Sequence, residues 1–170
     1  MRVLVTYSSK TGNTKKLADG IYEGLNVEDK VLLPMKEVSS IDEYDLILAG
    51  YWVDKAQPNA ESKVFLEKIK GKKVGLFATL GFWADSEHAW ESLVNGEALV
   101  KADNQVVGKF ICQGALDPRI IERFEKLPPE NPHAVTPEKR RRYEIAKKHP
   151  SQVDVLAAVE LFNERLVANV

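Results

Sequence analysis

Short apolar runs alternate with segments of helical periodicity along the first 112 residues of this 170-residue chain. The predicted strands are Arg2–Tyr7, Lys30–Leu33, Asp45–Gly50, Lys73–Thr79 and Val106–Cys112. Apolar residues at helical spacing predict helices over Thr14–Leu25, Glu61–Ile69 and Glu87–Val100. Strands that alternate with helices pair in parallel, and the connecting helices cover both faces of the sheet. The sequence therefore predicts an α/β fold, a doubly wound three-layer sandwich around a five-stranded parallel sheet.

The segment 113–150 is less regular and is predicted to add short helices after the last strand. Pro118–Leu127 has a helical pattern. A second helix is predicted to begin at Pro137, because Thr136 supplies a hydroxyl N-cap and proline suits the first helical position. Pro150 ends that helix, since proline cannot continue a helix interior.

A last helix is predicted over 151–168, where Ser151 and Asp154 form a capping pattern. Its apolar face has the spacing of a helix that docks on a sheet, and consists of Val155, Val159, Phe162 and Leu166. We expect one domain over 1–170 with 113–150 as a helical insertion, because 170 residues suffice for a single core.

Charge and composition exclude several classes of function. Lys plus Arg number 24 and Asp plus Glu number 25, so no global charge favours nucleic acid or a membrane surface as partner. No apolar run approaches the roughly 20 residues of a membrane span. Cys112 is the only cysteine, which rules out an internal disulfide and favours a cytoplasmic protein. The three histidines lie far apart without ligand spacing, so we expect no metal site.

Hydroxyl residues gather where the first strand meets the first helix, in the stretch "TYSSKTGNT" from Thr6 to Thr14. A helix N-terminus has unpaired N–H groups and a positive dipole, which stabilise an anion. The hydroxyls of Ser8, Ser9, Thr11 and Thr14 add donors, and Gly12 permits a positive φ. Helix capping alone needs only one such residue. Because both the P-loop and the dinucleotide pattern are absent, the stretch predicts a site for a terminal phosphate.

The hydroxyl-rich stretch resembles the phosphate loop of the flavodoxin family. In flavodoxins the pattern Ser/Thr-x-Thr-Gly-x-Thr wraps the phosphate of FMN, and Ser9–Thr14 matches every fixed position. The resemblance implies strand order 2-1-3-4-5, FMN as cofactor, and electron transfer between a reductase and an acceptor enzyme. The segments "SEHAW" and "NPHAVTPEKRRRYE" are similar to a small branch of the family, some members of which are associated with bilirubin reduction.

The same resemblance implies that the flavin ring lies between two further loops, which follow the third and fourth strands. Aromatic residues in both loops suit a flat ring system, and Trp52 is the first candidate for stacking. The aromatic residues of these two loops are also compatible with ordinary core or surface positions. The implied FMN-binding residues are Ser8, Ser9, Lys10, Thr11, Gly12, Asn13, Thr14, Tyr51, Trp52, Val53, Asp54, Thr79, Leu80, Gly81, Phe82 and Trp83.

The chain departs from many flavodoxins beside Trp52, where Val53 stands in place of a glycine and Lys55 lies among positions that are often acidic. The usual acidic docking face is therefore not expected. A basic run instead offers possible docking to redox partner proteins, through Lys139, Arg140, Arg141 and Arg142, although such a run is more often a solvated helix face.

Two other functions are alternatives to an electron carrier. One is an FMN-dependent oxidoreductase that reduces a quinone or linear tetrapyrrole directly, with 113–150 as a lid over the ring. The other is a signalling receiver domain, which needs an acidic pair after the first strand and an aspartate at the end of the third. Ser8, Ser9 and Gly50 stand at those positions, so the receiver is disfavoured. The protein itself is expected to supply no catalytic residue, because the flavin carries the chemistry.

Overall fold

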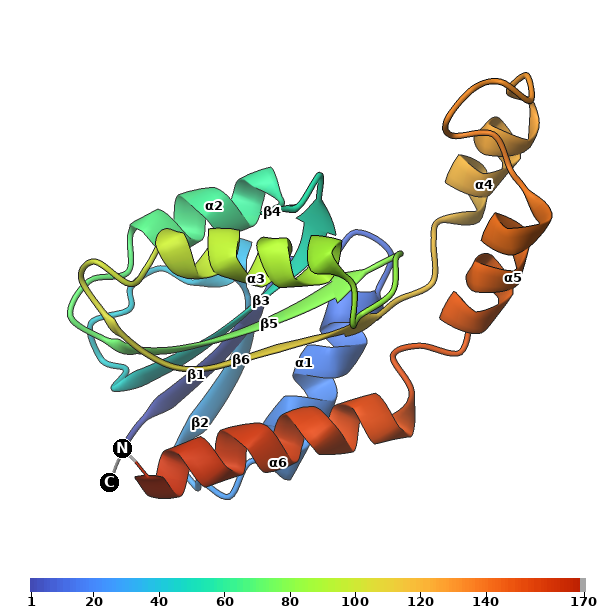
Figure 1. Cartoon of the computed structure of the whole chain (residues 1–170). Coiled ribbons are helices and arrows are strands. Elements are labelled where there is room, and N and C mark those ends of the chain that lie inside the picture. The colour runs from blue at the N-terminus through green and yellow to red at the C-terminus, as the bar shows by residue number, and fades with distance from the viewer. Residues whose placement is uncertain (169–170) are drawn as a thin grey trace.

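Five parallel strands form the central sheet in the order β2-β1-β3-β5-β6 (Figure 1). The computed structural model describes residues 1–168. The strands are β1 (Val3–Tyr7), β2 (Lys30–Pro34), β3 (Leu46–Asp54), β5 (Lys73–Leu80) and β6 (Gln105–Gln113). All five strands of the sequence prediction are present, and their order is the 2-1-3-4-5 that the resemblance implied.

The third strand is longer than predicted and turns back on itself. β3 continues past Gly50 to Asp54, because it pairs with β5 as far as Trp52 opposite Thr79. It then pairs antiparallel with the short β4 (Gln57–Pro58). Residues 51–54, which the resemblance placed in the loop after the third strand, belong to β3, so that placement was wrong; the pairing with β5 extends the strand beyond Gly50.

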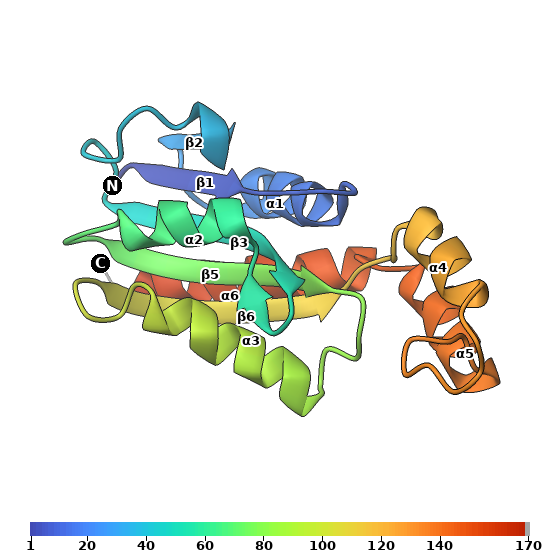
Figure 2. The same cartoon turned by 90° about the horizontal axis from the view of Figure 1, so that it is seen from above.

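Helices cover both faces of the sheet, which confirms the three-layer architecture (Figure 2). On one face, α1 (Asn13–Gly24) and α6 (Gln152–Ala168) enclose a core in which Phe77 and Phe162 meet edge to face. On the other face, α2 (Ala60–Glu67) and α3 (Glu87–Ala98) pack over Leu76. A one-turn 3₁₀ helix, η1 (Met35–Glu37), follows β2.

The last helix docks largely as predicted. Phe162 and Leu166 of α6 are buried, and Val155 packs against the same core cluster. Ala158, which the predicted face omitted, is also buried, whereas Val159 is only half-buried. The face thus lies slightly rotated from its predicted position.

Residues 114–150, here called the arm, project from the carboxyl end of the sheet and carry α4 (Pro118–Glu125) and α5 (Pro137–Ala146) (Figure 1). Asp117 caps α4 by accepting a 2.9 Å bond from the Arg119 N–H, and Thr136 caps α5 as predicted. An ion pair between Arg140 and Glu125 joins the two helices at 2.8 Å. The arm therefore adds two capped helices beside the carboxyl edge of the sheet.

Candidate functional site

A pocket of about 240 Å³ lies where the carboxyl ends of β1, β3, β5 and β6 meet the arm. Ligands of open parallel sheets bind at this edge. The predicted site residues that line this pocket are Ser9, Lys10, Thr11, Asn13, Thr14, Trp52, Val53, Thr79, Leu80 and Gly81. The arm adds Gly114, Ala115, Leu116, Asp117 and Ile120. Residues from all three predicted loops are thus brought to one cavity.

The hydroxyl loop forms one end of this pocket at the start of α1. Gly12 has φ 95°, a left-handed conformation that favours glycine, and its N–H donates to Ser9 Oγ at 3.1 Å. The hydroxyls of Thr14 and Thr79 lie 2.9 Å apart, and both residues are buried. The first turn of α1 carries two lysines and no acidic residue. The N–H groups and the dipole of α1 therefore favour an anion, whereas Lys15 pairs with Asp19 and Lys16 donates to the Pro150 carbonyl.

The arm is fastened directly to the hydroxyl loop. The Asn13 side-chain amide donates to the carbonyl of Ala115 at 2.9 Å and approaches Thr11 Oγ1 at 3.3 Å. The loop after β6 thus lies against the start of α1. This contact explains why residues after the last strand complete the pocket.

Apolar side chains also line this pocket. Trp52 and Val53 supply one side from β3, and Leu80, Leu116 and Ile120 supply apolar side chains from β5 and the arm. The Lys10 ammonium lies 5.2 Å from the centre of the Trp52 ring. A flat ring system that carries an anionic group fits such a pocket, because its lining combines aromatic and aliphatic surface with the donors of the hydroxyl loop.

Asp117 is an acidic group in this pocket that the sequence did not predict. Its carboxylate accepts hydrogen bonds from the Arg119 side chain, from Nε at 3.0 and 3.1 Å and from Nη2 at 2.7 Å. Hydrogen bonds from Arg119, together with the nearby charge of Lys10, lower the pKa of Asp117 to about 2. Its position four residues after the end of the last strand was a usable signal, because the carboxyl ends of parallel strands share one edge.

Ser8 and Gly12 belong to the hydroxyl loop but do not line the pocket. The Ser8 hydroxyl donates to Glu61 and accepts a 2.8 Å bond from Asn59. Gly12 shapes the turn from outside the cavity. Ser8 is therefore engaged in the scaffold behind the loop.

Four predicted aromatic-loop residues also lie outside the pocket. Tyr51 is fully buried beneath α3 and donates to the Ser92 carbonyl at 3.0 Å, and burial raises its pKa. Asp54 is exposed beside the β3–β4 turn. Phe82 lies under the Arg142 guanidinium at 4.4 Å, and Trp83 is half-buried in the same loop. The structure therefore brings only Trp52 of the four predicted aromatics to the pocket.

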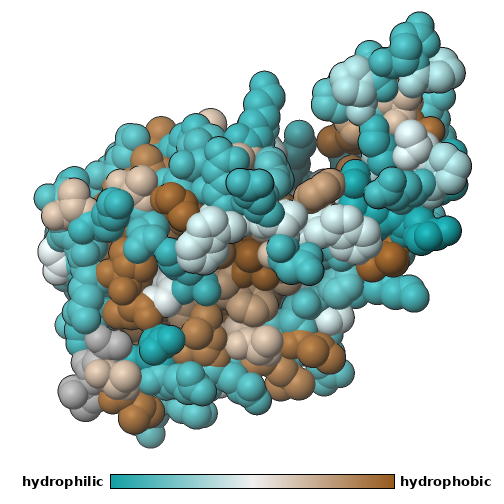
Figure 3. Space-filling model, in the orientation of Figure 1, coloured by the Kyte–Doolittle hydropathy of each residue, from teal (hydrophilic) through white to brown (hydrophobic). Residues whose placement is uncertain are grey.

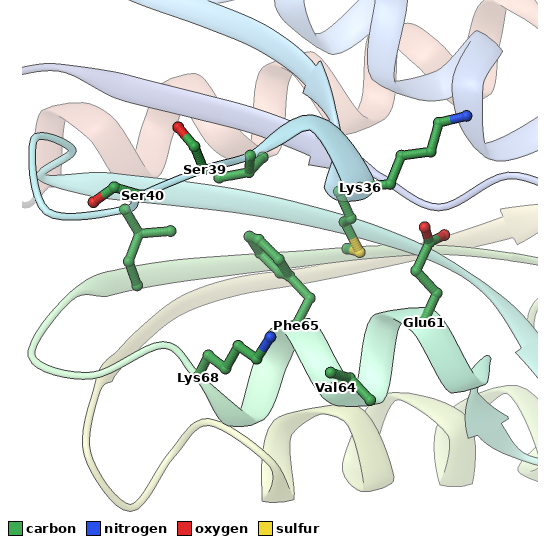
Figure 4. Close-up of a pocket in the computed structure, with 10 residues that line it drawn as sticks. Lys36, Ser39, Ser40, Glu61, Val64, Phe65 and Lys68 are labelled. Carbon is green, nitrogen blue, oxygen red and sulfur yellow. The ribbon is translucent and has the colours of Figure 1, made fainter.

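A larger pocket of about 360 Å³ lies between η1 and α2, with Met35 and Phe65 in its lining (Figure 4). Figure 4 shows Lys36 and Ser40 extending away from each other, so its polar groups do not converge on one point. Ligand sites combine apolar walls with convergent polar groups. The pocket at the sheet edge meets that description and the larger one does not.

Within residues 1–168, no helix is long and apolar enough to cross a membrane. The same part of the chain contains no cluster of three His, Cys, Asp or Glu side chains placed to hold a metal ion.

Comparison with known proteins gives consistent matches over nearly the whole chain. A family model described as a flavodoxin domain matches residues 4–163. The flavodoxin-like domain-containing protein BilS of Clostridioides difficile (strain CD3) is 33% identical over 165 residues, which cover 93% of this chain and 92% of BilS.

Solved structures share the fold. A flavodoxin of Streptococcus pneumoniae TIGR4 superposes with a TM-score of 0.63 at 14% identity and 100% coverage of both chains. A flavoprotein from Lactobacillus acidophilus NCFM in complex with FMN gives a TM-score of 0.52 at 20% identity, covering 74% of this chain and 99% of that one.

Proposed function

Because the chain belongs to the flavodoxin family, we propose that it binds FMN at the sheet edge and carries electrons between a reductase and an acceptor enzyme. The observation that supports this most directly is the pocket itself, which joins the hydroxyl loop at the start of α1 to Trp52 and an aliphatic surface. Bound FMN would supply the redox chemistry, and the protein its binding and orientation.

The donor set fits the two ends of FMN. Ser9, Thr11 and Thr14 offer hydroxyls to the phosphate, together with the free N–H groups of the first turn of α1. Trp52, Leu80 and Ile120 offer apolar surface to the ring. Of the remaining predicted residues, Ser8 and Tyr51 act behind the pocket in this proposal, since their polar groups already have protein partners.

Thr11→Ala tests the phosphate end. A hydrogen bond to a charged group contributes roughly 1.5–3 kcal/mol, so FMN should bind roughly 10- to 100-fold more weakly. Riboflavin, which lacks the phosphate, should bind as before. Quenching of flavin fluorescence measures both affinities, and Thr136→Ala on the arm is the matched control. Equal weakening of both flavins would place the phosphate elsewhere, and a wild-type protein that binds neither would overturn the proposal.

We further propose that redox partners dock on the arm beside the pocket. Residues 114–150 contain nine Lys or Arg and six Asp or Glu, a net charge of +3, whereas the rest of the chain has 15 against 19, a net charge of −4. Figure 3 shows the arm as a largely hydrophilic projection. Since the arm also supplies pocket residues, a partner with an acidic face would be steered close to the flavin.

The four predicted docking residues differ in availability. Lys139 donates to the carbonyls of Pro132 and Ala134, Arg140 pairs with Glu125, and Arg142 lies on Phe82. Arg141 is exposed and, among residues 1–168, forms no ion pair. Arg141→Glu should therefore slow electron transfer to a partner at low salt and leave FMN affinity unchanged. A transfer rate equal to that of wild type at every salt concentration would remove Arg141 from the docking surface.

Direct reduction of a quinone or linear tetrapyrrole remains the second candidate. Leu116 and Ile120 favour it, because they bring apolar side chains of the arm to the pocket and would shape a substrate site there. Steady NAD(P)H oxidation with such an acceptor and no partner protein would support this candidate over the carrier.

A further inference from the structure

Asn59 stands at the N-cap position of α2, but its side chain does not cap that helix. The side-chain amide instead donates to Ser8 Oγ at 2.8 Å, and Asn59 Oδ1 accepts a 2.8 Å bond from the Ser62 hydroxyl. Asn59, Ser8 and Ser62 are all buried. A residue type that usually caps a helix is here used for a bridge between segments.

The bridge reaches both ends of the pocket. Ser8 is the residue of the hydroxyl loop that follows β1, and its hydroxyl also donates to Glu61 of α2. On the other side, the Asn59 N–H donates to the carbonyl of Trp52 at 3.2 Å. One buried residue therefore contacts both the base of the phosphate loop and the strand that carries the ring-stacking side chain.

We propose that Asn59 is a positioning residue that couples the phosphate end of the pocket to its ring end. This rests on the proposed function, because it assigns those two ends to FMN. An anion in the hydroxyl loop restrains Ser8, Ser8 restrains the Asn59 side chain, and the Asn59 peptide restrains Trp52. Binding at one end then raises the affinity of the other end by the same factor in either direction, which defines a coupling free energy between the two sites.

The two halves of FMN can be offered separately to test this coupling. Inorganic phosphate occupies the hydroxyl loop and riboflavin the ring end, so the dissociation constant of riboflavin is measured with phosphate and with chloride at equal ionic strength. In wild type, phosphate should tighten riboflavin binding by roughly two- to tenfold, the range of one neutral hydrogen bond. In Asn59→Ala this phosphate effect should disappear.

Asn95→Ala is the matched control. The Asn95 amide donates to the carbonyl of Ala56 at 2.7 Å and so holds the same β3–β4 hairpin from α3, without contacting the hydroxyl loop. This variant should keep the phosphate effect, whatever its absolute affinity for riboflavin. If Asn59→Ala is unfolded by circular dichroism, Ser8→Ala replaces it, because it removes the same amide contact from the other side.

The outcomes separate this inference from the proposed function. If wild type binds neither FMN nor riboflavin, the proposed function fails. If wild type binds FMN but shows no phosphate effect, or if Asn59→Ala retains it, Asn59 does not couple the two ends. Loss of the effect in Asn95→Ala as well would assign it to general loosening of the hairpin and would equally overturn the inference.

Discussion

The turn of the β3–β4 hairpin gives a prediction whose size follows from the backbone. Val53 pairs with Pro58 and Asp54 with Gln57, so Lys55 and Ala56 form a two-residue turn. Both have positive φ, 51° and 58°. A two-residue hairpin turn with positive φ at both positions is of type I′, for which Asn-Gly is the preferred sequence. The strain lies at Lys55 and Ala56, whereas Val53 is an ordinary strand residue.

Glycine at either position should have opposing effects on the free energy of unfolding. A left-handed conformation costs a non-glycine residue roughly 1–2 kcal/mol. Glycine removes that cost but loses roughly 0.5–1 kcal/mol of additional chain entropy on folding. Lys55 is exposed, so Lys55→Gly should stabilise the protein by about 0.5–1 kcal/mol. Ala56 is only 8% exposed, and losing its buried methyl costs about 0.8 kcal/mol, so Ala56→Gly should be nearly neutral.

Urea denaturation followed by far-UV circular dichroism measures both variants. The midpoint of Lys55→Gly should rise at an unchanged m-value, and that of Ala56→Gly should stay close to wild type. A lower midpoint for Lys55→Gly would show that the turn is not strained. Equal stabilisation by both variants would show that the Ala56 methyl adds nothing.

Two further predictions concern the attachment of the arm. The pKa of Asp117 is lowered in the folded protein, so the stability that Asp117 contributes is present above its unfolded pKa near 4 and is lost as the pH falls towards 2. The difference in thermal midpoint between wild type and Asp117→Asn should accordingly be constant above about pH 5 and should shrink below about pH 4. A difference that stays constant down to about pH 2 would show that the pKa of Asp117 is not lowered in the folded protein. Arg142→Ala removes a cation–π contact at 4.4 Å to Phe82, which is worth about 0.5–1 kcal/mol, so limited proteolysis should cut the arm more readily while the global unfolding midpoint changes little. Unchanged cleavage of the arm would show that Arg142 does not hold it.

The sheet was predictable from the sequence because its strands are compact apolar runs bounded by turn and helix signals. β5 shows this well, since it is buried along nearly its whole length and the predicted bounds miss only Leu80. The end of β3 was not predictable in the same way. The glycine at position 50 predicts the end of a strand, but pairing of Trp52 with Thr79 on β5 extends the strand, and that pairing exists only in the folded sheet.

The two ends of the candidate site were predictable to different degrees. The hydroxyl loop is local, because Ser9–Thr14 form one turn between a strand and a helix, and the sequence pattern captures it. The ring end depends on which side chains converge in space. Phe82 matched the expected aromatic pattern, yet it packs under Arg142, while Leu116 and Ile120 of the arm reach the pocket. No local pattern indicates such contacts between segments far apart in the sequence.

The difference between the two ends also bears on function. Thr14 at the start of α1 and Thr79 in β5 are both buried, so the phosphate end is held by the core of the fold. The aliphatic side chains of the arm come from its α4 end, and within the described structure none of the residues of α4 is buried. Contacts with Asn13 and Phe82 attach the arm to the body. The proposed phosphate end thus includes buried residues, whereas the proposed ring end is bordered by an arm whose α4 is not buried. For the proposed electron carrier, this arrangement holds the cofactor against the core while its ring lies beside the arm on which redox partners are proposed to dock.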